Sequence, residues 1–141
     1  MKLESNWRNR TIEDLEKCKW PDEIEYDSHL VKTTTALRKE TLNTFTIEDL
    51  RIMIGQNLGL DYLIPLALER LAENLFAEGD LYEGDLLQSV LKIETGFWDN
   101  NKDYWLALHR LMKARRQEVR RSKIDTTNFY NSKNNIKFFK I

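Results

Sequence analysis

Cysteine, proline and glycine are scarce in this chain of 141 residues, which contains one, two and five of them, respectively. Because Cys18 is the only cysteine, no disulfide can form within the chain, and this is typical of a reducing compartment. The sequence has no apolar run of about eighteen residues, and residues 1–5 lack the apolar segment of a signal peptide. We therefore expect a cytoplasmic protein without a membrane partner.

Residues that bind metals or carry catalysis are also few. His29, His109 and Cys18 are far apart in the sequence and share no metal-ligand spacing. The segment from Asp80 to Asp85 lacks the alternating acids and the closing Glu of a calcium loop. The glycines form neither a phosphate loop nor a dinucleotide fingerprint, and a lone cysteine is more often a small core residue than a nucleophile. The sequence therefore predicts no metal, no cofactor, no small-molecule substrate and no enzymatic activity.

Apolar residues, in contrast, are plentiful at 41%, and they include four Trp, five Tyr and six Phe. They recur at helical spacings, and no strand-like alternation of useful length is present. We predict an all-α fold, a single-domain antiparallel bundle of about five to six helices over residues 1–123. Residues 124–141 form a basic, Asn-rich extension. Its four aromatic residues favour partial docking over complete disorder; they are Phe129, Tyr130, Phe138 and Phe139.

Two predicted helix starts share the sequence Thr-Ile-Glu-Asp, beginning at Thr11 and at Thr46. In both, a hydroxyl can cap a free N–H, and two acids in the first turn favour the helix dipole. Asp49 occupies the capping-box position of the second start. The first helix must end before Pro21, because the residue preceding a proline disfavours helical geometry. Ser28 can cap a helix between the two, with the apolar residues Leu30, Val31, Ala36 and Leu37.

The centre of the chain predicts three successive helices. The first follows Thr46 and is expected to stop at Gly59, because glycine commonly ends helices. The second is expected over residues 61–79, with Pro65 in its first turn or at a kink, and the third opens at Asp85. The residues expected on their buried faces are Leu50, Met53, Ile54, Leu58, Leu63, Leu66, Ala67, Leu71, Leu75, Leu86, Leu87, Val90 and Leu91. A last long helix is expected over residues 101–121, packing Trp105, Leu108, Leu111 and Met112.

Charge is unevenly distributed along the chain, although the formal net charge is only -1. Residues 110–141 contain ten Lys/Arg and two Asp/Glu, whereas residues 1–109 contain twelve and twenty-one. An acidic body attracts basic partners and repels phosphate. The basic end could instead bind nucleic acid in a salt-dependent manner.

The basic residues of the last predicted helix could share one face, and they are Arg110, Lys113, Arg116, Arg120 and Lys123. Cations near a helix C-terminus also interact favourably with the dipole, and the acidic body offers them an internal partner. A structural role is therefore favoured over a phosphate-binding one. The alternative function is a nucleic-acid-binding helical regulator that uses the last helix and tail. Charge reversal would test it at Arg115, Arg116, Arg120 and Arg121.

Two acidic clusters, each containing a tyrosine, are the candidate partner-binding surface. Together they could produce a negative field that steers a basic partner, and tyrosine is a favoured anchor in protein interfaces. Exposed loops also carry such charges as ordinary solvation. The candidate residues are Asp22, Glu23, Glu25, Tyr26, Asp27, Glu78, Asp80, Tyr82, Glu83 and Asp85.

Several short motifs in residues 30–91 are shared with a known family. They are Leu37-Arg38-Lys39, Phe45-Thr46-Ile47-Glu48-Asp49-Leu50-Arg51, Ile54-Gly55-Gln56, Gly59-Leu60, Pro65-Leu66-Ala67-Leu68, Glu78-Gly79-Asp80 and Gly84-Asp85-Leu86-Leu87. With these motifs the chain resembles bacterial immunity proteins of contact-dependent growth inhibition (CDI) systems. The resemblance implies a small cytoplasmic helical protein that binds the C-terminal domain of a cognate toxin and blocks it. Toxins of such systems are often nucleases, and an acidic inhibitor would suit their basic surfaces.

Overall fold

The computed structural model describes residue 3, residues 5–20 and residues 28–132. These residues form helices and connecting loops, and none of them belongs to a β-strand. The elements are η1 (Trp7–Asn9), α1 (Ile12–Glu16), α2 (His29–Leu37), η2 (Leu42–Thr44), α3 (Ile47–Gly55), α4 (Leu60–Glu73), α5 (Asp85–Leu91), α6 (Thr95–Asn100), α7 (Lys102–Ala114), α8 (Arg116–Arg121) and α9 (Thr127–Tyr130). The prediction of an all-α fold is confirmed.

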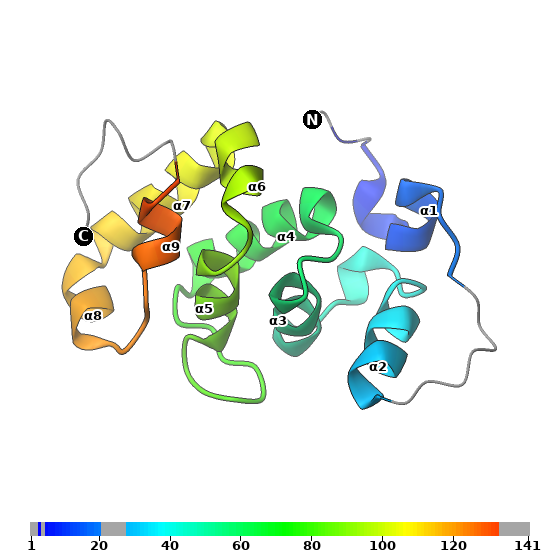
Figure 1. Cartoon of the computed structure of the whole chain (residues 1–141), viewed down its shortest axis with the longest axis horizontal. Coiled ribbons are helices and arrows are strands. Elements are labelled where there is room, and N and C mark those ends of the chain that lie inside the picture. The colour runs from blue at the N-terminus through cyan, green and yellow to red at the C-terminus, as the bar shows by residue number, and fades with distance from the viewer. Residues whose placement is uncertain (1–2, 4, 21–27, 133–141) are drawn as a thin grey trace.

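The helices are arranged along the chain from one end of the molecule to the other (Figure 1). α1 and α2 lie at one end, α3, α4 and α5 form the centre, and α6–α9 lie at the other end. The predicted caps position the first half of this arrangement. Thr11 Oγ1 accepts from the backbone N–H of Asp14 at 3.1 Å, and Ser28 Oγ accepts from that of Val31 at 3.1 Å. Local sequence therefore fixes where these helices begin.

A reciprocal capping box begins α3, as the second Thr-Ile-Glu-Asp sequence predicts. Thr46 Oγ1 accepts from the backbone N–H of Asp49 at 3.1 Å, and Asp49 Oδ2 accepts from that of Thr46 at 3.0 Å. The box satisfies two N–H groups that would otherwise lack a helical partner. The same helix end also carries Glu48, whose carboxylate faces a neighbouring loop described below.

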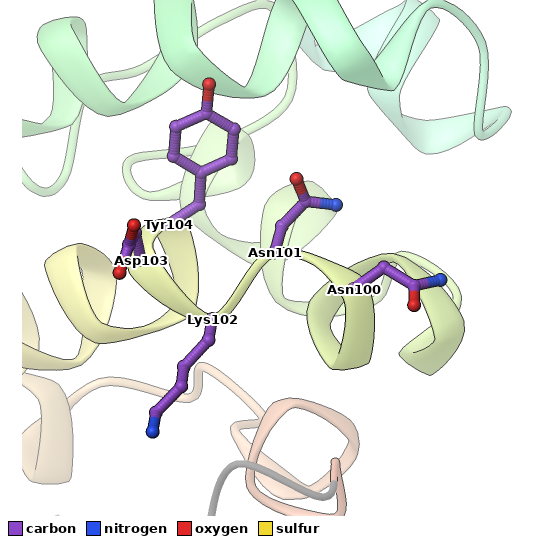
Figure 2. Close-up of a pocket in the computed structure, with 5 residues that line it drawn as sticks. All are labelled: Asn100, Asn101, Lys102, Asp103 and Tyr104. Carbon is purple, nitrogen blue, oxygen red and sulfur yellow. The ribbon is translucent and has the colours of Figure 1, made fainter. Parts of the chain in front are cut away.

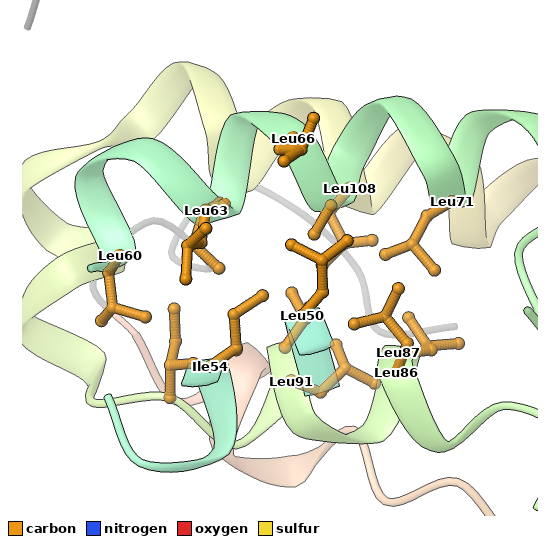
Figure 3. Packing of buried hydrophobic residues seen from close by; sticks show 14 of the residues in the cluster. Leu50, Ile54, Leu60, Leu63, Leu66, Leu71, Leu86, Leu87, Leu91 and Leu108 are labelled. Carbon is orange, nitrogen blue, oxygen red and sulfur yellow. The ribbon is translucent and has the colours of Figure 1, made fainter. Parts of the chain in front are cut away.

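The central core lies between α3, α4 and α5, and α7 packs on α4 and contributes Leu108 to the same cluster (Figure 3). Most of the side chains that fill it come from the predicted stripes, although Leu58 is only half-buried. The completely or almost completely buried members are Leu50, Met53, Ile54, Leu63, Leu66, Ala67, Leu71, Leu75, Leu86, Leu87, Val90 and Leu91. Leu60 and Ile64 of α4 are also buried and were not predicted. Because a fully buried aliphatic side chain contributes about 1.5–3 kcal/mol, this layer makes a large contribution to the stability of the fold.

Two predicted helix ends in the centre are wrong. α3 stops at Gly55, and Gly59 serves as the N-cap of α4 with a left-handed φ of 61°. A Cβ on Gly59 would lie 2.7 Å from Ile12 Cδ1, so α1 packs directly on this turn. α4 ends at Glu73, well before Gly79. Residues 74–84 are consequently a loop, and Pro65 is accommodated inside α4.

The buried face of α2 also differs from the prediction. Leu30 and Val31 are 41% and 43% exposed, whereas Thr34, Thr35 and Leu37 are buried. The threonine hydroxyls can be buried because both donate to the carbonyl of Val31, at 3.1 and 2.8 Å. Hydroxyl bonding within the helix therefore places a polar pair inside and an apolar pair outside.

The predicted last long helix is divided into two. α7 ends at Ala114, and Arg115 adopts a non-helical conformation before α8 begins. The basic residues of the two helices therefore do not continue along one helical face. α6, which precedes α7, was not expected from the sequence. Trp105, Leu108 and Met112 are buried in α7 as predicted, and Leu111 is half-buried.

Phe129 and Tyr130 of the C-terminal segment lie in the core, 0% and 1% exposed. Trp105 Nε1 donates to the carbonyl of Phe129 at 3.1 Å, and the two rings stack 5.0 Å apart. These contacts join α9 to α7. Phe138 and Phe139, for which docking is also expected, lie outside the described residues, and the division of the chain at residue 123 stays a prediction.

Candidate functional site

The loop between α4 and α5, residues 74–84, is organised by one buried carboxylate. Asp85 is only 2% exposed. Its Oδ1 accepts from the backbone N–H of Gly79 at 2.7 Å, and its Oδ2 accepts from those of Leu81 and Tyr82 at 3.0 and 3.4 Å. A single side chain at the start of α5 thus fixes the path of the loop backbone. We call residues 74–84 the α4–α5 loop.

A second carboxylate completes this network from α3. Glu48 Oε1 accepts from the backbone N–H of Asp80 at 2.9 Å. Arg51 holds Glu48 in place through two parallel bonds, Nε to Oε1 at 2.7 Å and Nη2 to Oε2 at 2.5 Å. Its Nε also lies 3.8 Å from Asp85 Oδ2. The four consecutive N–H groups of residues 79–82 therefore all donate to charged oxygens. The first three bonds are short and charge-assisted, whereas that of Tyr82 is long.

The pKa values of the network reflect these contacts. The hydrogen bonds from Arg51 hold the pKa of Glu48 below its usual value, and Glu48 in turn raises the pKa of Arg51. Burial by itself would raise the pKa of Asp85, but the bonds from the N–H groups of Gly79, Leu81 and Tyr82 outweigh it and lower that pKa. Both carboxylates are consequently ionised at neutral pH, the state in which they accept these bonds.

The network presents an apolar pair surrounded by acids. Leu81 is 63% exposed and Tyr82 is 47% exposed, and both are among the most exposed large apolar residues of the described chain. Glu78, Asp80 and Glu83 are exposed around them, and Glu78 forms an isolated antiparallel bridge with Glu83. A large exposed apolar pair on a loop with a fixed backbone is a feature of protein interaction sites.

The structure brings together the second of the two predicted acidic clusters. Glu78, Asp80, Tyr82 and Glu83 are exposed in the α4–α5 loop, whereas Asp85 is buried beneath it and supports its backbone. Asp22, Glu23, Glu25, Tyr26 and Asp27, the first cluster, lie outside the described residues. Three residues of this site were not among the predicted ones, namely Leu81, Glu48 and Arg51. The spacing of Glu48 and Arg51 (i, i+3 on a helix) was the available signal for an ion pair.

The histidines and the cysteine occupy unrelated places. His29 Nε2 lies 3.3 Å from Thr33 Oγ1 on the exposed side of α2. His109 is buried, with Nδ1 2.8 Å from the hydroxyl of Tyr130, and Cys18 is exposed. Burial lowers the pKa of His109 and raises that of Tyr130. In the part of the chain that the structure describes, no three His, Cys, Asp or Glu side chains are grouped to hold a metal ion.

A polar hollow of ≈ 470 Å³ lies at the turn between α6 and α7, lined by Asn100, Asn101, Lys102, Asp103 and Tyr104 (Figure 2). Tyr104 points toward α4, whereas Lys102 points in the opposite direction. Burial and the nearby charge of Asp61 raise the pKa of Tyr104, and its ring stacks on Phe97 at 6.4 Å. Asn101 donates to the carbonyl of Phe97 at 2.8 Å. Asn101 and Tyr104 therefore join α6 to α7, and the contacts of the hollow indicate a role in packing.

The basic residues at the end of the described chain are only partly engaged. Arg115 binds Glu118 through two parallel bonds of 2.6 and 2.5 Å. Arg110, Lys113, Arg116 and Arg120 are exposed, but they belong to two different helices. A continuous phosphate-binding face along one helix is therefore not formed. Among the described residues, no helix combines the length and the apolar character needed to cross a bilayer.

A known protein family matches most of the chain. Residues 14–108 match the model of a family described as CDI immunity proteins. No curated protein and no solved structure matches the chain significantly. The matched range contains α2–α6 and the whole α4–α5 loop, and it ends within α7. The family consists of immunity proteins rather than enzymes, so the prediction of no enzymatic activity is confirmed. The chain belongs to the family of CDI immunity proteins.

Proposed function

We propose that this immunity protein binds its cognate CDI toxin domain through the α4–α5 loop and inhibits it in the cytoplasm of the producing cell. The observation that carries the proposal is the exposure of Leu81 and Tyr82 on a loop whose backbone is fixed by Asp85 and Glu48. The family supplies the class of partner, and this loop supplies a surface that could recognise it.

The loop has the two properties that a tight interface needs. Its backbone is ordered before binding, so that little conformational entropy is lost when a partner engages it. Its tip offers apolar surface at Leu81 and Tyr82, and tyrosine is a frequent hot-spot residue. Glu78, Asp80 and Glu83 add negative charge around this pair. We therefore expect the toxin to present an apolar depression with basic residues at its rim.

The proposed toxin is a nuclease. Nucleases bind phosphate through basic surfaces, and an acidic loop would compete with nucleic acid for such a surface. The acidic body of the chain, with twenty-one Asp/Glu against twelve Lys/Arg in residues 1–109, supports this choice. The acidic segment at residues 22–27 is proposed from the sequence to belong to the same binding surface.

Co-purification with the toxin domain encoded immediately upstream of this chain, followed by calorimetric titration, tests the proposal. We expect a one-to-one complex in which the toxin loses its activity. The double variant Leu81→Ala/Tyr82→Ala should weaken the complex by about thirtyfold or more, equivalent to about 2 kcal/mol. Thermal denaturation should show that this variant is as stable as the unmodified protein, because both side chains are exposed.

The control is Arg116→Ala/Arg120→Ala, which truncates another exposed pair of side chains in α8, outside both the loop and the acidic segment at residues 22–27. It should change the affinity by less than about threefold. Equal losses for both double variants would contradict the assignment of the loop. A protein that fails to bind the toxin, yet binds DNA or RNA with steep salt dependence, would establish the alternative function in nucleic-acid binding.

A further inference from the structure

A groove of ≈ 460 Å³ separates the α4–α5 loop from the C-terminal end of α8. It is lined by Phe76, Glu83, Glu118, Arg121, Ser122 and Lys123. One wall comes from the acidic loop and the other from the basic end of α8. The groove therefore lies next to the surface formed by Leu81 and Tyr82. Its wall at α8 carries positive charge, whereas the α4–α5 loop is acidic.

Both walls of the groove are anchored to α5. Asp85 holds the loop as described above, and Gln88, one turn further along, holds the segment after α8. Gln88 Nε2 donates to the carbonyl of Asp125 at 3.0 Å, and Gln88 Oε1 accepts from the backbone N–H of Asp125 at 2.8 Å. A Cβ on Gly84 would lie 3.3 Å from Phe76 and 3.2 Å from Ile124, so the two walls are packed together at their base. The groove is thus a preformed feature of the fold.

The unpaired charge in the groove is positive. Glu118 is already neutralised by Arg115, which binds it with two bonds. Arg121 and Lys123 are exposed, and within the described part of the chain neither side chain makes a hydrogen bond or an ion pair. Arg121 lies close enough to Glu118 to help lower its pKa, but the two direct bonds of Glu118 come from Arg115, so the positive charge of Arg121 is only partly offset. Glu83 is the remaining acid at the edge of the loop. An acidic side chain of a bound protein would therefore be attracted between Arg121 and Lys123, while Glu83 would repel it from the loop side.

We infer that this groove is the second half of the toxin-binding surface and receives an acidic side chain of the toxin domain at Arg121 and Lys123. The inference rests on the proposed function, since it assumes that the toxin docks on Leu81 and Tyr82 next to the groove. It also specifies the charges on the toxin, which should carry basic residues opposite the loop and an acidic residue opposite α8. Arg121 and Lys123 would repel a protein whose binding surface is entirely basic. The acidic loop and the basic wall together therefore favour the cognate toxin over other basic proteins.

The test is charge reversal within α8 and the segment after it. Arg121→Glu/Lys123→Glu should weaken binding of the upstream-encoded toxin domain by about tenfold or more, with a larger effect at low salt. The matched control is Arg116→Glu/Arg120→Glu, which makes the same charge change in exposed residues of the same helix outside the groove. It should alter the affinity by less than about threefold. Equal effects of the two double variants would show general attraction and overturn the inference.

Zero-length carbodiimide cross-linking of the complex gives an independent measurement. This reagent joins an amine to a carboxylate only when the two groups are in contact. Mass spectrometry should detect an amide between Lys123 and an Asp or Glu of the toxin, and Lys123→Arg should abolish it while preserving affinity. A complex that forms normally but lacks this cross-link would overturn the groove contact and leave the loop contact standing. Loss of all binding in the unmodified protein would instead contradict the proposed function.

Discussion

The central core and the α4–α5 loop are both built on α5, but opposite kinds of interaction hold them. Toward the core, α5 presents Leu86, Leu87, Val90 and Leu91, all completely buried against α3 and α4. Toward the loop, it presents Asp85, whose carboxylate binds three backbone N–H groups. Apolar burial does not depend on pH and is not screened by salt, whereas a charged network depends on pH and is weakened by screening. Stability and recognition can therefore be altered separately in this protein.

The largest effect is expected in the core. Leu87→Ala removes a fully buried side chain and should lower the free energy of unfolding by about 3 kcal/mol. Urea denaturation at neutral pH measures this loss. Once the variant is folded, its affinity for the toxin should be unchanged, because the loop network does not include Leu87. A variant that keeps its stability but loses toxin binding would contradict the separation of the two regions.

A smaller loss of stability, accompanied by a loss of binding, is expected in the loop. Asp85→Ala leaves the N–H groups of Gly79, Leu81 and Tyr82 without their acceptor and should lower the free energy of unfolding by about 2 kcal/mol. It should also weaken toxin binding, since the tip of the loop is no longer fixed. Asp80→Ala is the control, because it removes the same charge from an exposed side chain of the same loop. Urea denaturation should show a change of less than about 0.5 kcal/mol for that control.

The pH dependence should distinguish the two regions further. The folded protein lowers the pKa values of Glu48 and Asp85, so their contribution to stability is fully present above their unfolded pKa values of about 4. It is lost as the pH falls through the lower, folded values. We expect urea midpoints to decrease between about pH 5 and pH 2, and to decrease less in Asp85→Asn. An identical decrease in both proteins would exclude Asp85 from the acid response.

The smallest effects are expected at two glycines. A Cβ on Gly79 would lie 2.6 Å from Glu48 Oε1 and 3.1 Å from Asp85 Oδ2, so Gly79→Ala should displace the carboxylates and cost about 1 kcal/mol. Gly96 in α6 has open space around the same position. Gly96→Ala should therefore stabilise the protein by about 0.5 kcal/mol through its helix propensity. Melting temperatures that shift in opposite directions would support the comparison, and two decreases would contradict it.

Much of the fold could be predicted because its determinants are local. Thr11, Ser28 and Thr46 begin helices through bonds to residues three positions away, and the leucine stripe follows the helical repeat. Helix boundaries were predicted wrongly where the same local sequence is compatible with two structures. A left-handed glycine can follow one helix or precede the next, and Gly59 does the latter. The break at Arg115 lies between two strongly helical sequences, and no residue there marks it in advance.

The candidate site was less predictable, because it depends on which way individual side chains point. The sequence Glu-Gly-Asp-Leu occurs twice, at residues 78–81 and 83–86, and it gives no sign that Asp85 is buried while Asp80 is exposed. That difference arises from the bend of the loop, which turns four N–H groups toward α3 and α5. Leu81 and Leu86 occupy equivalent positions in the two copies, yet one is the most exposed large apolar residue described and the other is completely buried. Tertiary packing decides between them.

The carboxylates of Asp85 and Glu48 bind the main chain of the loop and not its side chains. Every amino acid except proline offers the same N–H group. The side chains at residues 80–83 can therefore be exchanged while the loop keeps its shape. When the toxin changes during evolution, the immunity protein could therefore adapt its recognition surface by single substitutions in this loop. The fold and the backbone of the loop would stay the same.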